Sequence, residues 1–255
     1  MLLQQDLACY LADLLKPDQF KDYCPNGLQV AGQQHIKRIV TGVTACQALL
    51  DQAVKQQADT IIVHHGYFWK GEDPNIVGMK RSRLKTLLGN NINLFAYHLP
   101  LDLHMELGNN IQLAKKLDWQ VVGELPMCQS PSYGLMGRLY QPMSAEQFSA
   151  HLASTLEQMP VHIVGHQRKI HTIAWCTGAA QDWIEDAARA GVDAYISGEI
   201  SERTVHVARE LGIDYFAAGH HATERYGIQA LTHHLAEQYS TELDCIDFFD
   251  IANPV

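Results

Sequence analysis

The chain has 255 residues, of which 47% are hydrophobic and 18% charged. This composition is typical of a folded globular protein and excludes an intrinsically disordered chain, and the length allows one large domain or two of ordinary size. The formal net charge of −9 argues against general nucleic-acid binding, which needs a cationic face. A local basic patch stays open, because Met79–Lys85 (MKRSRLK) holds four cations.

The N-terminal residues indicate neither secretion nor membrane insertion. The stretch MLLQQDLACYLADLLKPD lacks the cationic start of a secretory signal, and no apolar run reaches the length of a membrane span. Its spacing predicts an amphipathic packing helix, with Leu7, Tyr10, Leu11 and Leu14 on one face. Six cysteines without a C-x-x-C pair argue against disulfides and thiolate zinc sites. We expect a cytoplasmic protein that is not associated with a membrane.

A long internal repeat follows the N-terminal helix. Residues 36–66 align without a gap to residues 170–200, with seven identities in thirty-one positions, against about two expected from average residue usage. Each copy reads as an apolar strand, a turn, a helix and a second apolar strand. This pattern predicts a βαβ unit in each half, with parallel strands and a right-handed crossover.

The similarity continues downstream of both copies. A helix and a strand follow at 83–97 and again at 201–218, and each strand leads to a histidine, three residues and a carboxylate. Although βαβ patterns are common, the shared register favours two related lobes. We therefore predict an α/β fold of two pseudo-repeated lobes with mainly parallel sheets flanked by helices. The first lobe spans 1–127 and the second 128–255, and the turn-forming residues 129–134 are expected to link them.

Imidazoles and carboxylates follow the predicted strands in both lobes. Ligands of parallel α/β sheets bind beyond the carboxyl ends of the strands, and the residues there are His64, His65, Asp102, Glu199, His220 and Glu224. A single histidine at a strand end is usually a hydrogen-bonded structural residue. This collection instead predicts a metal site between the lobes.

The spacing of these residues gives geometric expectations. His220 and Glu224 are four positions apart at the start of a predicted helix, so they can face one ion. Pro100 disfavours a helix between His98 and Asp102, and an extended chain would place those two about 13 Å apart.

The two adjacent histidines raise a different geometric question. Consecutive side chains on a strand point to opposite faces, so His64 and His65 can both bind metal only if the chain leaves the sheet, which Gly66 would permit. They can then serve two ions, about 3.5 to 4 Å apart, that clamp a bridging water. Imidazole and carboxylate donors suit Zn, Fe, Mn, Co or Ni and do not choose among them.

Five motifs together resemble the NIF-three-like family of dinuclear-metal hexameric proteins, also called type 2 homologues of GTP cyclohydrolase I. The resemblance covers essentially the whole chain in the short bacterial form of the family. The motifs are Pro25–Leu28 (PNGL), Val63–Gly66 (VHHG), His98–Asp102 (HLPLD), Ser197–Ser201 (SGEIS) and Gly219–Glu224 (GHHATE).

The resemblance implies a ligand set for two divalent cations per subunit. It would place His65 and Asp102 on one ion and His64 with His220 on the other, with Glu224 bridging them. His221 stands where the family often has tyrosine, so His220 is preferred as the ligand. His98 and Glu199 match family motifs and are expected behind the ligands or facing a substrate. The resemblance also implies a toroidal homohexamer whose metal sites face an internal cavity.

Three classes of function stay open at this point. The first is a metal-dependent hydrolase acting on a nucleotide or a related cyclic compound, with Glu199 or His98 as the general acid or base. The second is a non-enzymatic ring-shaped metalloprotein that binds a partner or serves as a scaffold. The third is an acid–base enzyme without metal.

Side chains after the first histidine pair are candidates for substrate contacts. The cations that could meet phosphates are Lys70, Arg81, Arg83 and Lys85, and the aromatics that could stack on a base are Tyr67, Phe68 and Trp69. A solvated charge run and packing aromatics are the alternative explanations, and both are more common.

Overall fold

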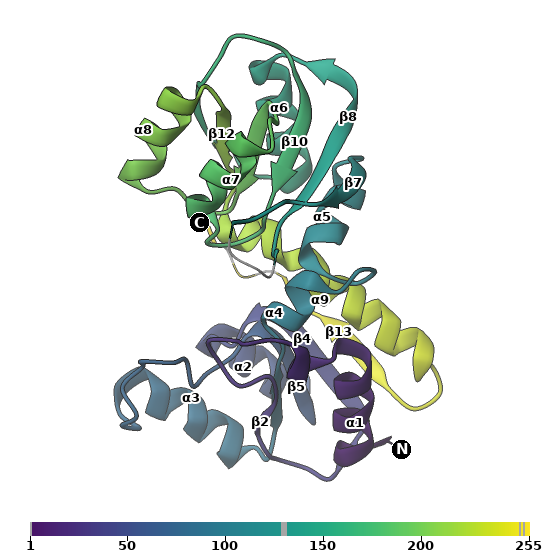
Figure 1. Ribbon diagram of the computed structural model, residues 1–255. Helices are drawn as coiled ribbons and strands as arrows, with labels where there is room; N and C mark the ends of the chain where they lie inside the picture. Colours follow the sequence, from purple (N-terminus) through teal and green to yellow (C-terminus); the bar gives the residue numbers. More distant parts are fainter. Residues whose placement is uncertain (1, 129–131, 250, 252) are drawn as a thin grey trace. The chain divides into compact units, whose positions relative to one another are not determined.

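Two compact units make up the chain in the computed structural model, which describes residues 2–128, 132–249, 251 and 253–255. The first unit is Met1–Gly108 with Gly227–Ala252, and the second is Asn109–Tyr226 with Asn253–Val255. Each has its own sheet and its own flanking helices (Figure 1). The predicted α/β fold with two lobes is confirmed.

The bounds of these units differ from the predicted division between 127 and 128. The helix α5 (Asn109–Lys116) belongs to the second unit because its Leu113 packs into the core of that unit. The C-terminal strand β13 (Asp244–Asp247) returns to the first unit because it pairs with β4 (Arg38–Thr44). The expected linker 129–134 falls between two paired strands of the second unit, and its residues 129–131 lie outside those described.

The first sheet has the strand order β13-β4-β5-β6-β2. Its four strands β13, β4, β5 and β6 are parallel, and β2 pairs with β6 in the antiparallel direction. The remaining bounds are Gly27–Val30 for β2, Thr60–His65 for β5 and Asn93–Ala96 for β6. A separate two-stranded ribbon pairs β1 (Leu2–Leu3) with β3 (His35–Ile36).

Helices cover both faces of the first sheet. One face packs against α2 (Gln47–Lys55) and α3 (Gly78–Gly89), in a cluster that includes Val40, Leu49, Ile61 and Leu87. The other face packs against α1 (Gln4–Leu15) and the later part of α9 (His220–Gln238), in a cluster that includes Leu7, Ile39, Ile62 and Leu231. Alternate side chains of β4 and β5 point to opposite faces of the sheet, so the same two strands contribute to both hydrophobic cores.

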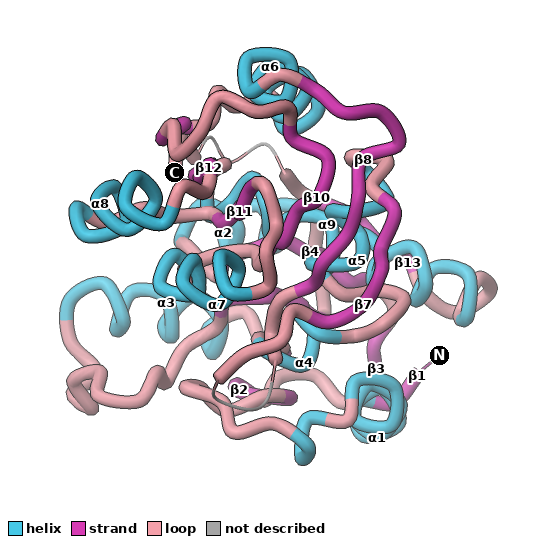
Figure 2. Tube along the Cα trace, turned by 45° about the horizontal axis from the view of Figure 1, so that its top comes forward, coloured by secondary structure: helices cyan, strands magenta, loops and turns pink. Residues whose placement is uncertain are grey.

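The second sheet has the strand order β7-β8-β10-β11-β12-β9. Its β10, β11 and β12 are parallel, whereas β7, β8 and β9 pair in the antiparallel direction. The long β8 runs between β7 and β10 (Figure 2). The bounds are Gln120–Glu124 for β7, Leu135–Met143 for β8, Val161–Ile163 for β9, Ile170–Trp175 for β10, Ala194–Ser197 for β11 and Asp214–Ala217 for β12.

Helices also cover both faces of the second sheet. One face carries α5 and α6 (Ala145–Leu156), whose Leu113 and Phe148 pack with Trp175. The other carries α7 (Ile184–Arg189) and α8 (Glu202–Leu211), with Ile184 and Ala208 buried there. Short helical segments complete the chain: η1 (Pro17–Gln19), α4 (Leu99–Leu103) and η2 (Gln181–Trp183).

The repeat seen in the sequence is confirmed in the strand register. In the first unit Ile39 pairs with Thr60, and in the second the aligned residue Ile173 pairs with Ala194, which aligns with Thr60. Both pairs are parallel, and α2 and α7 occupy the same place between the two strands. Each copy is therefore the βαβ unit that the sequence predicts.

The aspartate shared by the two copies explains part of their identity. Asp59 Oδ2 accepts hydrogen bonds from the backbone N–H groups of Lys37 and Arg38, at 2.8 and 3.0 Å. Asp193 Oδ2 accepts from the aligned N–H groups of His171 and Thr172, at 3.0 and 2.9 Å. Each carboxylate thus ties the start of the second strand to the start of the first.

No helix in the described part of the chain is long and apolar enough to cross a membrane.

The shared carboxylates give a stability prediction. Asp59→Ala and Asp193→Ala each leave two backbone N–H groups without their acceptor, at least one of them partly buried, so each should lower the free energy of unfolding by about 1–3 kcal/mol. Urea denaturation measures this change. Asp51→Ala, on the exposed side of α2, is the matched control and should change stability by less than about 0.5 kcal/mol. Equal effects of all three substitutions would contradict the shared role.

Candidate metal centre

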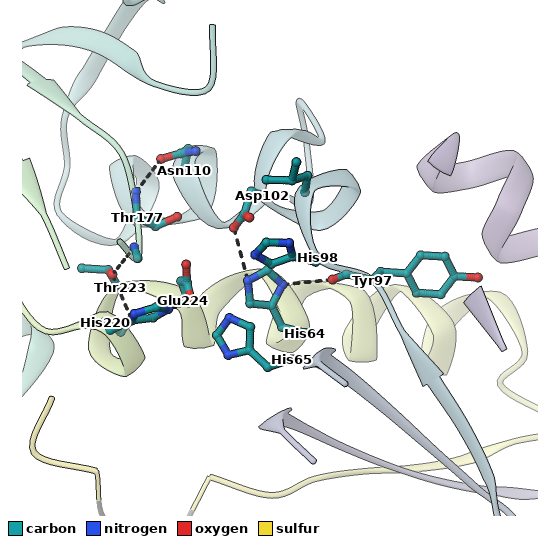
Figure 3. A network of polar contacts seen from close by, with 12 residues as sticks. His64, His65, Tyr97, His98, Asp102, Asn110, Thr177, His220, Thr223 and Glu224 are labelled. Atoms are coloured by element: carbon teal, nitrogen blue, oxygen red, sulfur yellow. Dashed lines mark hydrogen bonds and ion pairs between the residues drawn. The ribbon is translucent and has the colours of Figure 1, made fainter. Parts of the chain in front are cut away.

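The first unit gathers four donor side chains at the carboxyl ends of β5 and β6. His64 and His65 end β5, and His98 and Asp102 lie at the start of α4, which follows β6 (Figure 3). His64, His65 and His98 each present one ring nitrogen within 4.8 Å of the other two. The strand ends therefore converge as the rule for parallel sheets predicts.

His64 is completely buried and fixed on both sides of its ring. Its Nδ1 lies 2.9 Å from the carbonyl oxygen of Tyr97. Because a carbonyl can only accept, Nδ1 carries the proton, and the lone pair of a neutral ring stays on Nε2. That Nε2 lies 3.4 Å from Asp102 Oδ1. Two donors of one tetrahedral ion, each 2.0–2.1 Å from it, are about 3.3 Å apart.

His65 is the last residue of β5, so the chain does not leave the sheet between the two histidines. It pairs with Thr44 in the sheet, and its Nδ1 lies 3.2 Å from Thr44 Oγ1. The ring centroids of His64 and His65 are nevertheless only 4.4 Å apart. The alternation rule fixes the direction of each Cα–Cβ bond, and the rings beyond it can still approach at the end of a strand.

Gly66 is required by packing. A Cβ atom there would lie 2.2 Å from Gln29 Oε1 and 2.5 Å from the Cβ of Ala96. The same Gln29 oxygen accepts a 2.7 Å hydrogen bond from the Tyr67 N–H, which fixes the turn directly after the histidine pair. The glycine in this motif thus lets β6, through Ala96, and β2, through Gln29, pack directly against the turn.

The segment from His98 to Asp102 is helical, and the predicted extended conformation was wrong. α4 spans Leu99–Leu103, and the Asp102 N–H bonds to the His98 carbonyl oxygen at 3.1 Å. Pro100 is tolerated because it stands in the first turn, where its missing N–H would have had no helical partner. One helical turn brings the two side chains onto the same side.

Asp22 and Asn26 hold this turn in place. Asp22 accepts hydrogen bonds from His98 Nδ1 at 2.7 Å and from the Leu99 N–H at 2.9 Å. Asn26 Oδ1 accepts from the His98 N–H at 2.7 Å. Burial alone would raise the pKa of Asp22, but the hydrogen bonds from His98 and Asn26 and the charge of His98 lower it to about 2. Asp22 is therefore ionised at neutral pH and orients His98.

Cys24 lies beside this pair, and its thiol holds its proton firmly. Asp22, Cys24 and His98 offer donor atoms within 4.8 Å of one another. Burial, and then the charge of Asp22, raise the pKa of the Cys24 thiol to about 12. A thiol binds metal as the thiolate, so a cation would have to displace a firmly held proton from Cys24.

The second unit presents His220 and Glu224 on the first turn of α9 (Figure 3). Glu224 is 3% exposed, and its Oε2 lies 2.9 Å from His220 Nε2. The four-residue spacing thus brings both side chains to one side of the helix, as the sequence predicts.

Glu199 orients His220 from the opposite side of the ring. His220 Nδ1 lies 2.7 Å from Glu199 Oε1. Burial by itself lowers the pKa of His220, but the carboxylates of Glu224 and Glu199 raise it to about 9. A cation bound by Nε2 would have to displace the proton held between these acids.

Two glycines leave room for this pair. Gly178 has a φ of +67°, and a Cβ atom on it would lie 2.0 Å from Glu224 Oε1. A Cβ atom on Gly198 would lie 2.7 Å from the Cα of His220. The backbone at these glycines therefore lies directly against Glu224 and His220, and a side chain at either position would occupy their space.

Several residues that build these groups are not predicted by the sequence. Asp22, Thr44 and Gly178 carry no local signal, because each acts on a side chain distant in the sequence. Asn26 lies in the PNGL motif, but the motif does not predict its contact with His98. His221, set aside as a ligand, donates its backbone N–H to the Val255 carbonyl oxygen at 2.9 Å, and it is in no three-donor cluster within one unit among the described residues.

The donors in both units are imidazoles and carboxylates. Such a set can hold a divalent cation of Zn, Fe, Mn, Co or Ni and disfavours metals that select thiolates. The first unit offers three imidazoles and one carboxylate, and the second offers one imidazole flanked by two carboxylates.

Comparisons with known proteins agree over nearly the full length. The model of the family Duf34/NIF3 (NGG1p interacting factor 3) matches residues 2–254. A Pseudomonas aeruginosa protein named GTP cyclohydrolase 1 type 2 homolog is 56% identical over 230 residues, which cover 89% of this chain and 91% of that protein. An Escherichia coli protein of the same name is 50% identical over 251 residues, 98% of each chain.

Solved structures show the same similarity. A protein described as "protein ybgI, unknown function" superposes with a TM-score of 0.93 at 48% identity and covers both chains completely. TTHA1606 from Thermus thermophilus superposes with a TM-score of 0.84 at 31% identity, over 98% of this chain and 100% of that one. With its two α/β units and their donor groups, the chain belongs to the Duf34/NIF3 family.

Proposed function

We propose that the protein binds two divalent cations per subunit through His64, His65, Asp102, His220 and Glu224. The observation that carries the proposal is that each of the three imidazoles has its Nδ1 held by a neighbouring group, at 2.7 to 3.2 Å. This arrangement aims Nε2 at a ligand and is the usual support of metal-bound histidine. The buried carboxylates Asp102 and Glu224 supply the negative charge that cations require.

The first unit favours one change to the ligand assignment implied by the family resemblance. The 3.4 Å separation of His64 Nε2 and Asp102 Oδ1 suits two ligands of one ion. We therefore pair Asp102 with His64, and His65 with His220, and keep Glu224 as the bridging carboxylate. Glu199 then acts by orienting His220.

We further propose that the protein is a metal-dependent hydrolase acting on a nucleotide or a related cyclic compound. Bound divalent cations acidify water and polarise the group that it attacks. The name shared by the relatives, GTP cyclohydrolase 1 type 2 homolog, supports the substrate class. His98, fixed by the ionised Asp22, presents its second nitrogen beside His64 and His65, with ring centroids 5.3 and 5.8 Å away. That nitrogen can take or give a proton during the reaction.

A ring-shaped scaffold without catalysis is the second candidate. Ions that only stabilise an assembly would use the same ligands, but they would not need an imidazole oriented by a buried carboxylate next to them. The Asp22–His98 pair therefore favours the hydrolase. Following the family resemblance, we also propose a cytoplasmic homohexamer.

Metal content tests the ligand set. Wild type, reconstituted with Mn²⁺ or Zn²⁺ and dialysed, should retain two ions per chain, and Glu224→Ala should lose at least one because the proposed bridge is removed. Elemental analysis measures both. Glu202→Ala, an exposed carboxylate on α8, is the matched control and should keep the full content. Less than one ion per wild-type chain would exclude both metal-dependent functions.

The pKa of His220 predicts a pH dependence of metal binding. Below pH 9 the metal-free imidazole holds a proton that a cation must displace, so affinity should rise by up to about tenfold per pH unit between pH 7.5 and 8.5. Titration calorimetry in buffers of different ionisation enthalpy measures the released proton. Glu199→Gln removes one of the carboxylates that raise the pKa, and the rise should flatten in that range. A pH-independent affinity in wild type contradicts the expected proton release.

Catalysis is tested by hydrolysis of a panel of nucleotides and cyclic amides. Asp22→Asn should reduce kcat by about 100-fold or more while metal content stays unchanged, because His98 loses its orientation. Asp18→Asn, a surface change in the same segment, should leave kcat as in wild type. Equal background turnover by wild type and Glu224→Ala would leave the scaffold as the function.

A further inference from the structure

A cavity of about 400 Å³ lies within the first unit, between the turn after β5 and the start of α3. A volume of this size is in the range of small-molecule sites. It is lined by Gly66, Tyr67, Trp69, Glu72, Asp73, Asn75, Val77, Met79, Lys80 and Arg83. None of the proposed metal ligands is among the lining residues.

Two of the four charged side chains of the lining, Glu72 and Lys80, neutralise each other. Lys80 forms an ion pair with Glu72 and also donates to the Asp73 carbonyl oxygen at 3.1 Å. The Asp73 carboxylate accepts from the N–H and the side-chain amide of Asn75, at 2.9 and 2.8 Å. These contacts fix the segment between β5 and α3, where Asp73 keeps its negative charge, and they do not involve the second cationic residue of the lining.

Arg83 is that residue. Among the described residues no carboxylate lies within ion-pair distance of its guanidinium, and its buried Nε has no hydrogen-bond partner. The guanidinium lies 6.0 Å from the centre of the Tyr67 ring. Its neighbours Arg81 and Lys85 in the basic run are exposed to solvent, so they fit the solvated charge run. A half-buried cation without a counter-ion at a cavity is costly unless an anion comes to it.

The start of α3 adds to the positive potential of the cavity. The helix begins after Val77 and has no side-chain cap, so its first N–H groups keep their attraction for an anion. Val77 and Met79 both line the cavity. An arginine and an uncapped helix start on the same cavity form a combination suited to a phosphate group.

Two aromatic side chains of the lining, Tyr67 and Trp69, are fixed in position. The Tyr67 hydroxyl donates to the Ala45 carbonyl oxygen at 2.7 Å, and the Trp69 indole N–H donates to the Gly66 carbonyl oxygen at 3.2 Å. Because both aromatic rings are held, they offer preformed surface for a ring. The Trp69 ring is centred 5.0 Å from that of His98 and 6.0 Å from that of His65.

We propose that this cavity binds a small phosphate-bearing ring compound, with the phosphate on Arg83 and the ring against Trp69. Binding needs no metal ion. Hydrolysis of the bound ligand rests on the proposed function. It would take place at the imidazoles of the first unit, which lie on the other side of Trp69. The substrate class is then a phosphomonoester such as a nucleoside monophosphate.

Titration calorimetry on metal-free full-length protein, with GMP and guanosine as probes, tests the proposal. GMP should bind at least tenfold more tightly than guanosine. Arg83→Gln should weaken GMP binding by about 10- to 100-fold and abolish the difference between the probes. Arg81→Gln removes the same charge from the same helix at an exposed position and should leave GMP affinity unchanged.

The outcomes separate this site from the metal centre. Glu224→Ala should bind GMP like wild type, so loss of metal or of hydrolysis leaves the proposal standing. No GMP binding, equal binding of GMP and guanosine, or equal effects of the two arginine substitutions would overturn it. A thermal unfolding midpoint of Arg83→Gln close to that of wild type shows that a lost affinity is not a loss of folding.

Discussion

A hydrogen bond on Nδ1 fixes every histidine of the candidate metal centre. His64 uses the Tyr97 carbonyl oxygen, His65 the Thr44 hydroxyl, His98 the Asp22 carboxylate and His220 the Glu199 carboxylate. In each case Nε2 is the nitrogen left to face a ligand or a reacting group. If these partners were lost, the imidazoles would still be present, but their rings would no longer be held for binding.

The two βαβ copies have the same backbone arrangement but carry different side chains at the candidate metal centre. The aligned aspartates Asp59 and Asp193 close the same backbone contacts in each unit. At the end of the second strand, however, the first copy carries the histidine pair, whereas the aligned positions of the second copy are Gly198 and Glu199. There the glycine makes room for His220 and the glutamate orients it. The two copies therefore have the same fold but different donor side chains at the end of the second strand.

Charge has separate roles on the two sides of the turn after β5. Towards the histidines, buried carboxylates compensate for the cations proposed there. Towards α3, Glu72 and Lys80 neutralise each other, while Arg83 keeps its charge beside an aromatic wall. Within the first unit, Trp69 lies between the cavity proposed to bind phosphate and the imidazoles of His65 and His98.

The sequence by itself determined the βαβ repeats, the parallel register and the donors at the strand ends, because these depend on local periodicity and on the rule that ligands bind at carboxyl ends. It misjudged the α4 turn, since the contacts that stabilise a helix around Pro100 come from Asp22 and Asn26, far away in the chain. It could not show which partner orients each imidazole or that Arg83 lacks a counter-ion. Those features depend on distances between remote residues, which only the tertiary structure decides.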